Sequence, residues 1–361
     1  MLDRLDALAE AFRKQAGACA SLGSSQYSHL MAALADNIES GGISRDLLLS
    51  APTDAWREAV PLRLAAAVHR IVLRGDAPTL ATRYASAGGD GGPIGPDEFL
   101  ATAAHYRGEI DAALRETVQT NEVGRCAALR PAFAHASRRC PLPLNMLEIG
   151  ASAGLLSHWD RYAYIDHANG RSAGDSSSGV RLVDRWSAAV DLDIEQEVAH
   201  RAMCDISPLD ARRVEDQQRL LSFVWPDQRH RLELLRSALA VAAHYAIAVD
   251  AADAGDWLAE QLPNSASGML TVVFHAIVWQ YLPLTTKQVV RSVIEDAGER
   301  ATRDRPIAWI RMEPAGAVAD VRVTEWPGGR ESQLLTTSYH GADVRPPLRS
   351  DQHLDPTPSD T

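Results

Sequence analysis

The chain has 361 residues, of which 46% are hydrophobic, and its 47 Asp and Glu residues exceed its 36 Lys and Arg residues to give a net charge of −11. Such an acidic chain repels a phosphate backbone, and no basic block interleaved with aromatic residues occurs in it, so nucleic acid is excluded as an expected partner. Its length suffices for one large α/β domain and a smaller one.

No segment is suited to export or to a membrane. The N-terminal sequence MLDRLDALAEAFRKQ carries charges at every third or fourth residue and lacks the apolar core of a signal peptide. The apolar run 269–279 is interrupted by His275 and is shorter than the roughly 20 residues that cross a bilayer. The four cysteines show no C-x-x-C spacing, which favours a reducing compartment and disfavours a zinc site. We expect a cytoplasmic protein without a metal or a membrane partner.

The first 140 residues have the pattern of successive helices. Apolar side chains recur at steps of three and four residues over 2–12, 27–38 and 99–118, and alternating β-branched runs are missing. A glycine-rich break over 86–98 separates two helical groups, and Pro96 marks the start of a helix. The sequence predicts a helical cap domain over residues 1–140.

After residue 140 the pattern alternates between strands and helices. Residues 145–149 predict a short strand, 150–154 a tight turn and 155–164 an amphipathic helix. A Gly- and Ser-rich surface loop at 167–181 and a candidate strand in VRLVDRW belong to an insertion over 165–197. Further strands are predicted at 198–210, 245–253, 269–279 and 307–314, and helices at 227–243, 254–262 and 285–298.

This alternation is typical of an α/β fold with a mostly parallel, Rossmann-like sheet covered on both faces. Residues 321–326 and 333–340 predict an antiparallel hairpin that closes the sheet at its C-terminal end. The Rossmann-like domain is therefore expected over residues 141–345, and the polar, Pro-rich residues 346–361 are expected to be a disordered tail.

The segment EIGASAG, residues 148–154, matches two unrelated motifs. Read as G-x-S-x-G between a strand and a helix, it is the nucleophile elbow of a serine hydrolase. That fold needs several strands and an H-G-G-G-type loop before the elbow, whereas everything upstream here is predicted to be helical. The catalytic triad of this alternative would be Ser152, then Asp250 or Glu313, then His340.

Read as acid-x-G-x-x-x-G, the same segment is the ligand loop that follows the first strand of a Rossmann-type sheet. Ser152 stands where a pyrophosphate needs bare backbone, so a dinucleotide is disfavoured. S-adenosylmethionine has no phosphates, and its amino acid end can lie over Gly150, Ala151, Ser152 and Gly154 and meet the carboxylate of Glu148. We favour this interpretation and expect S-adenosylmethionine as the cofactor.

A nucleoside ligand also needs an acid at the end of the second strand, where it accepts hydrogen bonds from the ribose hydroxyls. Asp205 follows an apolar run and precedes a turn, so it is preferred to Asp184. The interval from Glu148 to Asp205 exceeds the usual ~20 residues, and the insertion accounts for the excess. Asp250 ends the third strand, near the expected place of the adenine.

Five separated segments together resemble a bacterial family of unknown function over about residues 25–345: QTNEVGR, LEIGASAGLLSHWDRY, SFVWPDQRHR, VVFHAIVWQYLP and WIRMEP. The resemblance implies a fold similar to class I S-adenosylmethionine-dependent methyltransferases, without an established activity or substrate. Glu148, Gly150 and Gly154 match the first motif of those enzymes, Asp205 their ribose acid and Asp250 the acid near the adenine.

Ser152 departs from that pattern, because its place usually holds a glycine. The fourth strand ends in W-Q-Y-L-P and lacks the D/N-P-P-Y sequence of enzymes that methylate amino groups of nucleic acids. With the acidic charge, this indicates a small molecule or a protein side chain as the methyl acceptor.

The candidate residues for the acceptor lie within these segments or at strand ends, and each could equally serve packing or a salt bridge. The candidates for catalysis are Asn121, His275 and Tyr281. The candidates for binding the acceptor are Arg125, Trp159, Asp160, Trp225, Asp227, Gln228, Trp279, Arg311, Glu313 and His340. We predict methyl transfer, with a serine hydrolase and a non-catalytic ligand-binding protein as alternatives; the sequence leaves the oligomeric state open.

Overall fold

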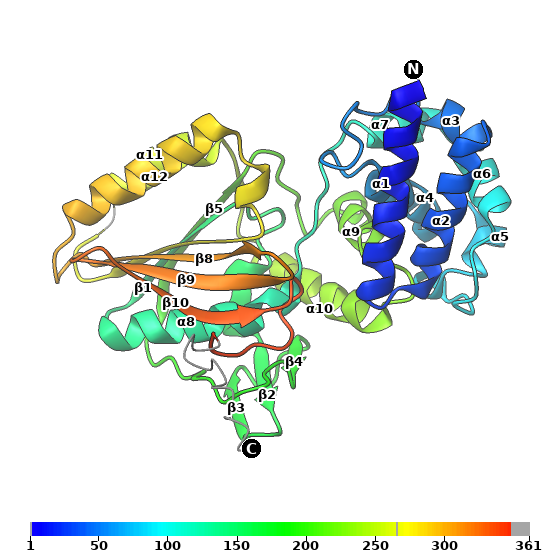
Figure 1. Ribbon diagram of the computed structural model, residues 1–361. Coiled ribbons are helices and arrows are strands. Elements are labelled where there is room, and N and C mark those ends of the chain that lie inside the picture. Colours follow the sequence, from blue (N-terminus) through cyan, green and yellow to red (C-terminus); the bar gives the residue numbers. More distant parts are fainter. Residues whose placement is uncertain (1, 265, 348–361) are drawn as a thin grey trace, which may run out of the picture. The chain divides into compact units, whose positions relative to one another are not determined.

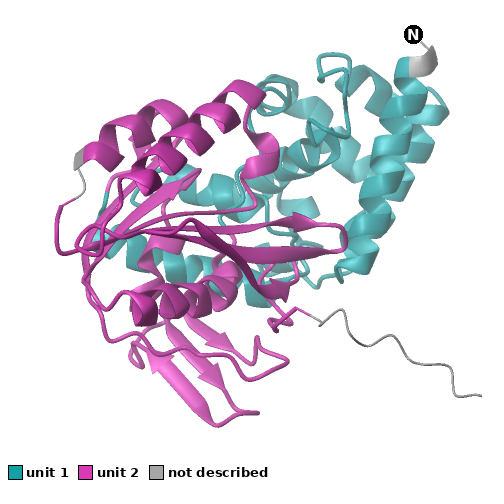
Figure 2. Cartoon of the chain, turned by 60° about the vertical axis from the view of Figure 1, so that its left-hand side comes forward, with its two compact units in different colours: residues 1–121, 209–247 teal, residues 122–208, 248–361 magenta. Residues whose placement is uncertain are grey.

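The computed structural model describes residues 2–264 and 266–347. It divides the chain into two compact units, shown in Figure 2: unit 1 combines Met1–Asn121 with Leu209–Ile247, and unit 2 combines Glu122–Pro208 with Ala248–Thr361. This division differs from the expected boundary at residue 140. Leu209–Ile247 belong to the same unit as the N-terminal helices, and residues 122–140 belong to the same unit as the sheet. Most of the tail expected at 346–361 lies outside the described residues.

Unit 1 is helical, as its apolar periodicity predicts (Figure 1). Its N-terminal part contains α1 (Leu2–Ser21), α2 (Ser25–Glu39), α3 (Ile43–Leu47), α4 (Val60–Arg74), α5 (Pro78–Ala81), η1 (Ala85–Ala87), α6 (Pro96–His105) and α7 (Arg107–Ala113). The later segment adds α9 (Val214–Ser222), which the sequence did not predict, and α10 (Arg229–Tyr245). Trp225 lies in the same buried cluster as Phe12, Leu34 and Val68, which explains why this segment belongs to unit 1.

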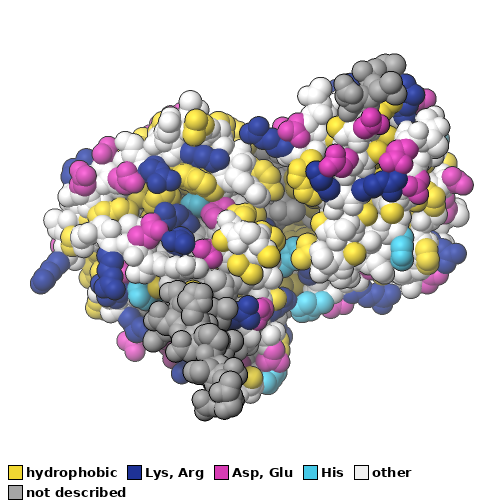
Figure 3. Space-filling view, in the orientation of Figure 1, with side chains coloured by type: hydrophobic (Ala, Val, Ile, Leu, Met, Phe, Trp, Pro, Cys, Tyr) yellow, Lys and Arg dark blue, Asp and Glu magenta, His cyan; other side chains and the backbone are white. Residues whose placement is uncertain are grey.

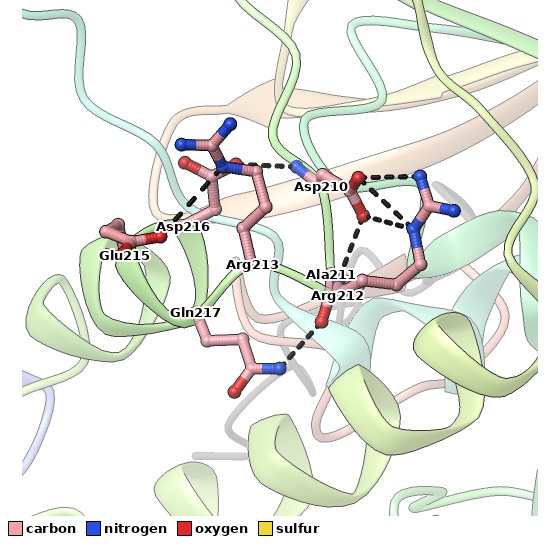
Figure 4. A network of polar contacts seen from close by, with 7 residues as sticks. All are labelled: Asp210, Ala211, Arg212, Arg213, Glu215, Asp216 and Gln217. Carbon is pink, nitrogen blue, oxygen red and sulfur yellow. Dashed lines mark hydrogen bonds and ion pairs between the residues drawn. The ribbon is translucent and has the colours of Figure 1, made fainter.

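A turn of charged residues precedes α9 (Figure 4). The Asp210 carboxylate accepts hydrogen bonds from the backbone amide of Arg212 at 2.9 Å and from its guanidinium, and the Asp210 amide donates to Asp216 at 2.9 Å. Gln217 closes the turn by donating to the carbonyl of Ala211 at 2.7 Å. These bonds fix the start of α9, whose own N-cap residue provides no side-chain cap.

Unit 2 is built on a seven-stranded sheet in the order β10-β9-β8-β7-β1-β5-β6. β1 (Leu144–Ile149) and β7 (Leu270–Ala276) are buried at every position, as the central strands of a parallel sheet require. The other strands are β5 (Val198–Asp205), β6 (Asp250–Ala251), β8 (Ile307–Ala315), β9 (Val318–Trp326) and β10 (Arg330–Thr337). β9 runs antiparallel to both β8 and β10, and the other pairs are parallel, so the predicted α/β fold with a mostly parallel sheet and antiparallel C-terminal strands is confirmed.

Helices cover both faces of this sheet (Figure 1). α11 (Ala254–Gln261), η4 (Leu262–Asn264) and α12 (Leu284–Glu299) lie on one face, where Leu258 and Ile294 join a core with Leu147, Val273 and Trp309. η2 (Val123–Arg125) leads into α8 (Cys126–Arg139), which lies on the opposite face. Among the described residues, no helix is long and apolar enough to cross a membrane.

Several predictions of local structure were wrong. Residues 155–164 form η3 (Leu156–Arg161) and the beginning of β2 (Ala163–Asp166) instead of one helix. The hydroxyls of Tyr162 and Tyr164 donate hydrogen bonds to the backbone carbonyls of Leu155 and Trp159. Both rings are fully buried on one side of an extended segment. β2 pairs with β3 (Arg171–Gly174), which lies within the predicted surface loop, and with β4 (Arg181–Val183), which lies in the predicted strand VRLVDRW. The three strands form a separate sheet.

Three others concern strand lengths. The strand expected at 245–253 is reduced to the two residues of β6, because α10 extends to Tyr245, residues 246–249 have no regular structure, and only Asp250 and Ala251 pair with β5. The second hairpin strand ends at Thr337, where the backbone turns at Ser338–Gly341. The strand expected at 198–210 likewise ends at Asp205, whose side chain begins a turn.

Candidate functional site

The strand order identifies one edge of the unit 2 sheet as the place for a ligand. From β1 the sheet continues to β5 and β6 on one side and to β7 and β8 on the other. In an open α/β sheet, ligands bind outside the carboxyl ends of the strands where the order reverses, which here is between β1 and β7. We call the ends of β1, β5 and β7, with the residues that follow them, the carboxyl edge.

Glu148 is the penultimate residue of β1 and is almost completely buried. Its Oε2 accepts a 2.6 Å hydrogen bond from the hydroxyl of Ser157 in η3. Burial raises the pKa of the Glu148 carboxyl to about 8, while the hydrogen bonds from Ser157 oppose the rise. A carboxyl group in this state can exchange a proton near neutral pH, which is typical of functional sites.

The loop after β1 has an unusual backbone. Gly150, Ser152 and Gly154 have φ angles of 67°, 56° and 70°, a region that favours glycine. A Cβ on Gly150 would lie 2.5 Å from Cγ1 of Val278, and one on Gly154 would overlap the sulfur of Met203. Both glycines are therefore needed for close packing within unit 2.

Ser152 is the exception in this loop, since a non-glycine residue at positive φ is uncommon. Its hydroxyl is buried and has no hydrogen-bond partner among the described residues. Buried hydroxyls are nearly always hydrogen-bonded, so this one marks a place where a ligand or water is expected.

Asp205 ends β5, the strand that is hydrogen-bonded to β1. Its Oδ2 accepts the amide of Ser152 at 2.8 Å, and its Oδ1 accepts the amide of Ser207 at 2.8 Å. The structure thus places Asp205 beside the loop, whereas Asp184 lies after β4 of the small sheet and binds His167. Asp250 lies on β6, and its Oδ2 accepts a 2.8 Å hydrogen bond from the indole of Trp257.

At the end of β7, one oxygen of Glu313 collects three donors. Oε1 lies 2.6 Å from Nδ1 of His275 and accepts the amides of Val278 at 3.1 Å and Trp279 at 3.2 Å. The His275 ring is fully buried and stacks on Trp279, with 5.4 Å between ring centroids and 15° between planes. It also contacts Trp309, so it lies on the α11–α12 face, opposite to Glu148.

Arg125 reaches the same edge from the start of α8. Its Nη1 donates to the carbonyl of Ala276, the last residue of β7, at 2.9 Å, and its Nε donates to the carbonyl of Tyr339 at 3.2 Å. Gly124 packs so closely on the backbone of His340 that a Cβ would overlap its carbonyl oxygen. The segment before α8 and the turn after β10 therefore meet at the end of β7.

Four other candidates in unit 2 lie in structural contacts or at the surface. Trp159 packs on Phe133 with 5.0 Å between ring centroids, and Asp160 forms a bidentate pair with Arg201 at 2.8 and 2.9 Å. Arg311 binds Thr324 at 2.7 Å and Glu331 at 2.8 Å. Tyr281 is exposed in the short η5 (Trp279–Tyr281).

The remaining candidates belong to unit 1. Asn121 is its last residue before η2, and Trp225 lies in its core. Asp227 accepts the hydroxyl of Ser24 at 2.7 Å, and Gln228 donates to the carbonyl of Leu22 at 2.8 Å. Asp227 and Gln228 thus fix the turn between α1 and α2.

Sequence reasoning missed Ser157 and Val278. Ser157 fell within a segment predicted as an amphipathic helix, and Val278 within a predicted strand, so neither carried a chemical signal. Among the described residues, no group of three or more His, Cys, Asp or Glu side chains is arranged to hold a metal ion.

Comparison with known proteins identifies a family. A family model described as "Uncharacterized protein conserved in bacteria (DUF2332)" matches residues 9–345, which is nearly the whole chain. No curated protein and no solved structure matches the chain.

Proposed function

The chain belongs to the DUF2332 family, and we propose that it is a methyltransferase that binds S-adenosylmethionine at the carboxyl edge of unit 2. The proposed acceptor is a small molecule or a protein side chain. The single observation that carries the proposal is the pair of acidic side chains, Glu148 and Asp205, on either side of the positive-φ loop between β1 and η3. They stand at the end of adjacent parallel strands, where a Rossmann-type sheet binds nucleosides.

The loop suits a ligand without phosphates. Backbone N–H groups are what bind a pyrophosphate in this fold. Here the amide of Ala151 donates to Cys204 at 2.9 Å, that of Ser152 to Asp205, and that of Gly154 to Ala151 at 2.7 Å. Because these three donors are satisfied within the protein, a nucleoside with an amino acid tail fits this loop better than a dinucleotide.

The residues present also fit the groups of S-adenosylmethionine. Each carboxylate oxygen of Asp205 accepts one amide and has a further lone pair, which leaves capacity for ribose hydroxyls. The Ser152 hydroxyl needs a partner, and Glu148 is suited to the ammonium group, whose charge would return its raised pKa toward the ordinary value. When bound, the cofactor supplies an activated methyl group on a sulfonium sulfur.

The protein's share of such a reaction is alignment and exclusion of water. Glu148, Asp205 and the loop would hold the donor, and Arg125 and Glu313 would keep the end of β7 in place beside it. His275 and Tyr281 remain candidates for the acceptor side. Figure 3 shows basic and acidic side chains interspersed on the visible face, which gives no support for a nucleic acid as the acceptor.

One observation favours a serine hydrolase, namely the positive φ of Ser152, since a nucleophile elbow holds its serine on a strained turn. The proposed partners do not assemble, however. Glu313 binds His275 rather than His340, Asp250 binds the indole of Trp257, and the Ser152 hydroxyl has no imidazole partner among the described residues. We therefore rank this alternative second.

Calorimetry with S-adenosylmethionine and S-adenosylhomocysteine tests the proposal. We expect both to bind to the purified chain with one site per molecule; a folded sample that binds neither would refute it. Binding without methyl transfer to any offered acceptor would favour the non-catalytic alternative. Covalent labelling of Ser152 by a fluorophosphonate, lost in Ser152→Ala, would instead support the hydrolase.

A further inference from the structure

Glu313 on β8 accepts hydrogen bonds from His275 of β7 and from the residues that follow β7. Three donors converge on its Oε1: Nδ1 of His275 at 2.6 Å, and the amides of Val278 and Trp279 at 3.1 and 3.2 Å. Two of these donors are backbone N–H groups, so Oε1 must act as an acceptor. A carboxylate supplies stronger bonds to several donors than a neutral oxygen does.

The segment held in this way, residues 277–279, is strained. Ile277 has a φ of 57°, which is an outlier for a β-branched residue. A backbone of this kind persists only when its surroundings determine it, and such positions cluster at functional sites. Here the amide of Ile277 donates to Met312 at 2.8 Å, and the next two amides donate to Glu313. β8 therefore supplies every one of these three contacts.

The strained turn is also a wall of the proposed site. The side chain of Val278 fills the space where a Cβ of Gly150 would lie, at 2.5 Å. Gly150 begins the loop that contains Ser152, whose amide binds Asp205. A shift of residues 277–279 would thus open or fill the space next to Gly150 directly, without any change in Glu148 or Asp205.

We infer that Glu313 is a positioning residue: its carboxylate holds the 277–279 turn against Gly150 and so sets the shape of the ligand site at the carboxyl edge. This inference rests on the proposed function for its ligand. It assigns to Glu313 a role other than the expected contact with the acceptor. It also accounts for the burial of His275 near the end of β7. The His275 Nδ1 and the amide of Trp279, whose ring stacks on His275, both hydrogen-bond Oε1 of Glu313.

Two variants test this role. Glu313→Ala removes all three hydrogen bonds, and Glu313→Gln keeps an acceptor oxygen in the same place without the charge. Asp320→Ala is the matched control, because Asp320 lies opposite Glu313 in the β8–β9 pair and, among the described residues, its carboxylate hydrogen-bonds Arg322 and not the turn. Three quantities are measured for each: amide exchange of residues 277–282 without ligand, affinity for S-adenosylhomocysteine, and thermal stability.

We expect exchange at Val278 and Trp279 to become at least about tenfold faster in Glu313→Ala, and affinity to fall by about tenfold or more. Glu313→Gln should recover part of both effects, and Asp320→Ala should change neither. Unchanged exchange in both Glu313 variants would overturn the inference, and so would faster exchange with unchanged affinity. If the parent chain binds neither probe, the proposed function fails, while the exchange rates still decide whether Glu313 holds the turn.

Discussion

The backbone amide of Ser152 donates a 2.8 Å hydrogen bond to Oδ2 of Asp205. The serine that resembles a nucleophile and the acid expected to bind a ribose are therefore hydrogen-bonded to each other. This bond ties the loop after β1 to the end of β5, so the conformation of the loop depends on a residue that comes much later in the sequence. Asp205 accordingly has two roles in the proposed site, support of the loop and contact with the ligand.

Replacing Asp205 by alanine should weaken binding of S-adenosylhomocysteine by about ten- to a hundredfold, because charge-assisted hydrogen bonds to both the loop and the ligand are lost. Calorimetry measures the change. Asp210→Ala is a close control: Asp210 also accepts the amide two residues ahead, at 2.9 Å, but it does so in unit 1 before α9. Equal affinities for the parent and Asp205→Ala would show that the ribose acid is misassigned.

Glu148 should make the stability of unit 2 depend on pH. Its folded pKa is raised by burial from 4.5 to about 8, so the folded state favours the protonated form. This contribution to the free energy of unfolding is fully present below pH 4.5 and is lost as the pH rises toward 8, by at most about 5 kcal/mol.

Glu148→Gln keeps a neutral side chain and removes this dependence. The difference in unfolding free energy between the parent and Glu148→Gln, measured by urea denaturation, should therefore change steadily between pH 5 and pH 8 in favour of the variant. Parallel curves for the two proteins would contradict a raised pKa at this position.

The sequence was sufficient where one local pattern determines the structure. β1 and β7 are rich in apolar residues because both their faces are buried. β1 was predicted to within one residue, whereas β7 ends at Ala276, three residues before the end of the predicted strand. β6 has two exposed residues and depends on its pairing with β5, so the local pattern predicted a strand there but not its short extent. In η3 and β2, the buried Tyr162 and Tyr164 outweighed the helical spacing of their neighbours.

The same distinction between local patterns and distant contacts applies to the candidate site. Glu148, Gly150 and Asp205 were predicted because a motif and a strand end mark them. The place of Glu313 follows from the register of β8 against β7, in which Arg311 lies opposite His275, and a register between distant strands cannot be read from either strand alone. Trp159 and Asp160, which lie shortly after the motif, were expected at the site. Trp159 instead packs in the core and Asp160 pairs with Arg201, and both contacts are made with residues distant in the sequence.

His69 should make unit 1 sensitive to acid. It is buried on α4, where its Nδ1 lies 3.0 Å from the carbonyl of Ser222 and its Nε2 2.7 Å from the hydroxyl of Ser86. Burial lowers the pKa of His69 from 6.5 to about 4, so the unfolded chain binds a proton that the folded chain excludes. Its contribution to stability is complete above pH 6.5 and falls by about 3 kcal/mol as the pH drops toward 4.

Amide exchange in α4 reports this effect locally. Exchange of residues 60–74 should reveal a lower free energy of opening at pH 5 than at pH 7 in the parent, after correction for the intrinsic rate, and a smaller difference in His69→Gln. His29→Gln, at an exposed position of α2, should behave like the parent. An identical pH response in His69→Gln would place the acid sensitivity elsewhere.

Gly154 should be intolerant of a side chain for two separable reasons. Its φ of 70° costs an alanine about 1–2 kcal/mol, and the added Cβ would overlap the sulfur of Met203. We expect Gly154→Ala to lower the free energy of unfolding by about 2–4 kcal/mol in urea denaturation. Adding Met203→Ala should recover only the part due to overlap, so the double-mutant cycle separates sterics from backbone strain.

Gly17→Ala is the control, because Gly17 is exposed within α1 and its Cβ would meet nothing within 4 Å; it should stabilise the chain by about 0.5–1 kcal/mol. A Gly154→Ala protein as stable as the parent would mean that the loop can adopt another backbone, and the close packing that defines the proposed site would then not be required.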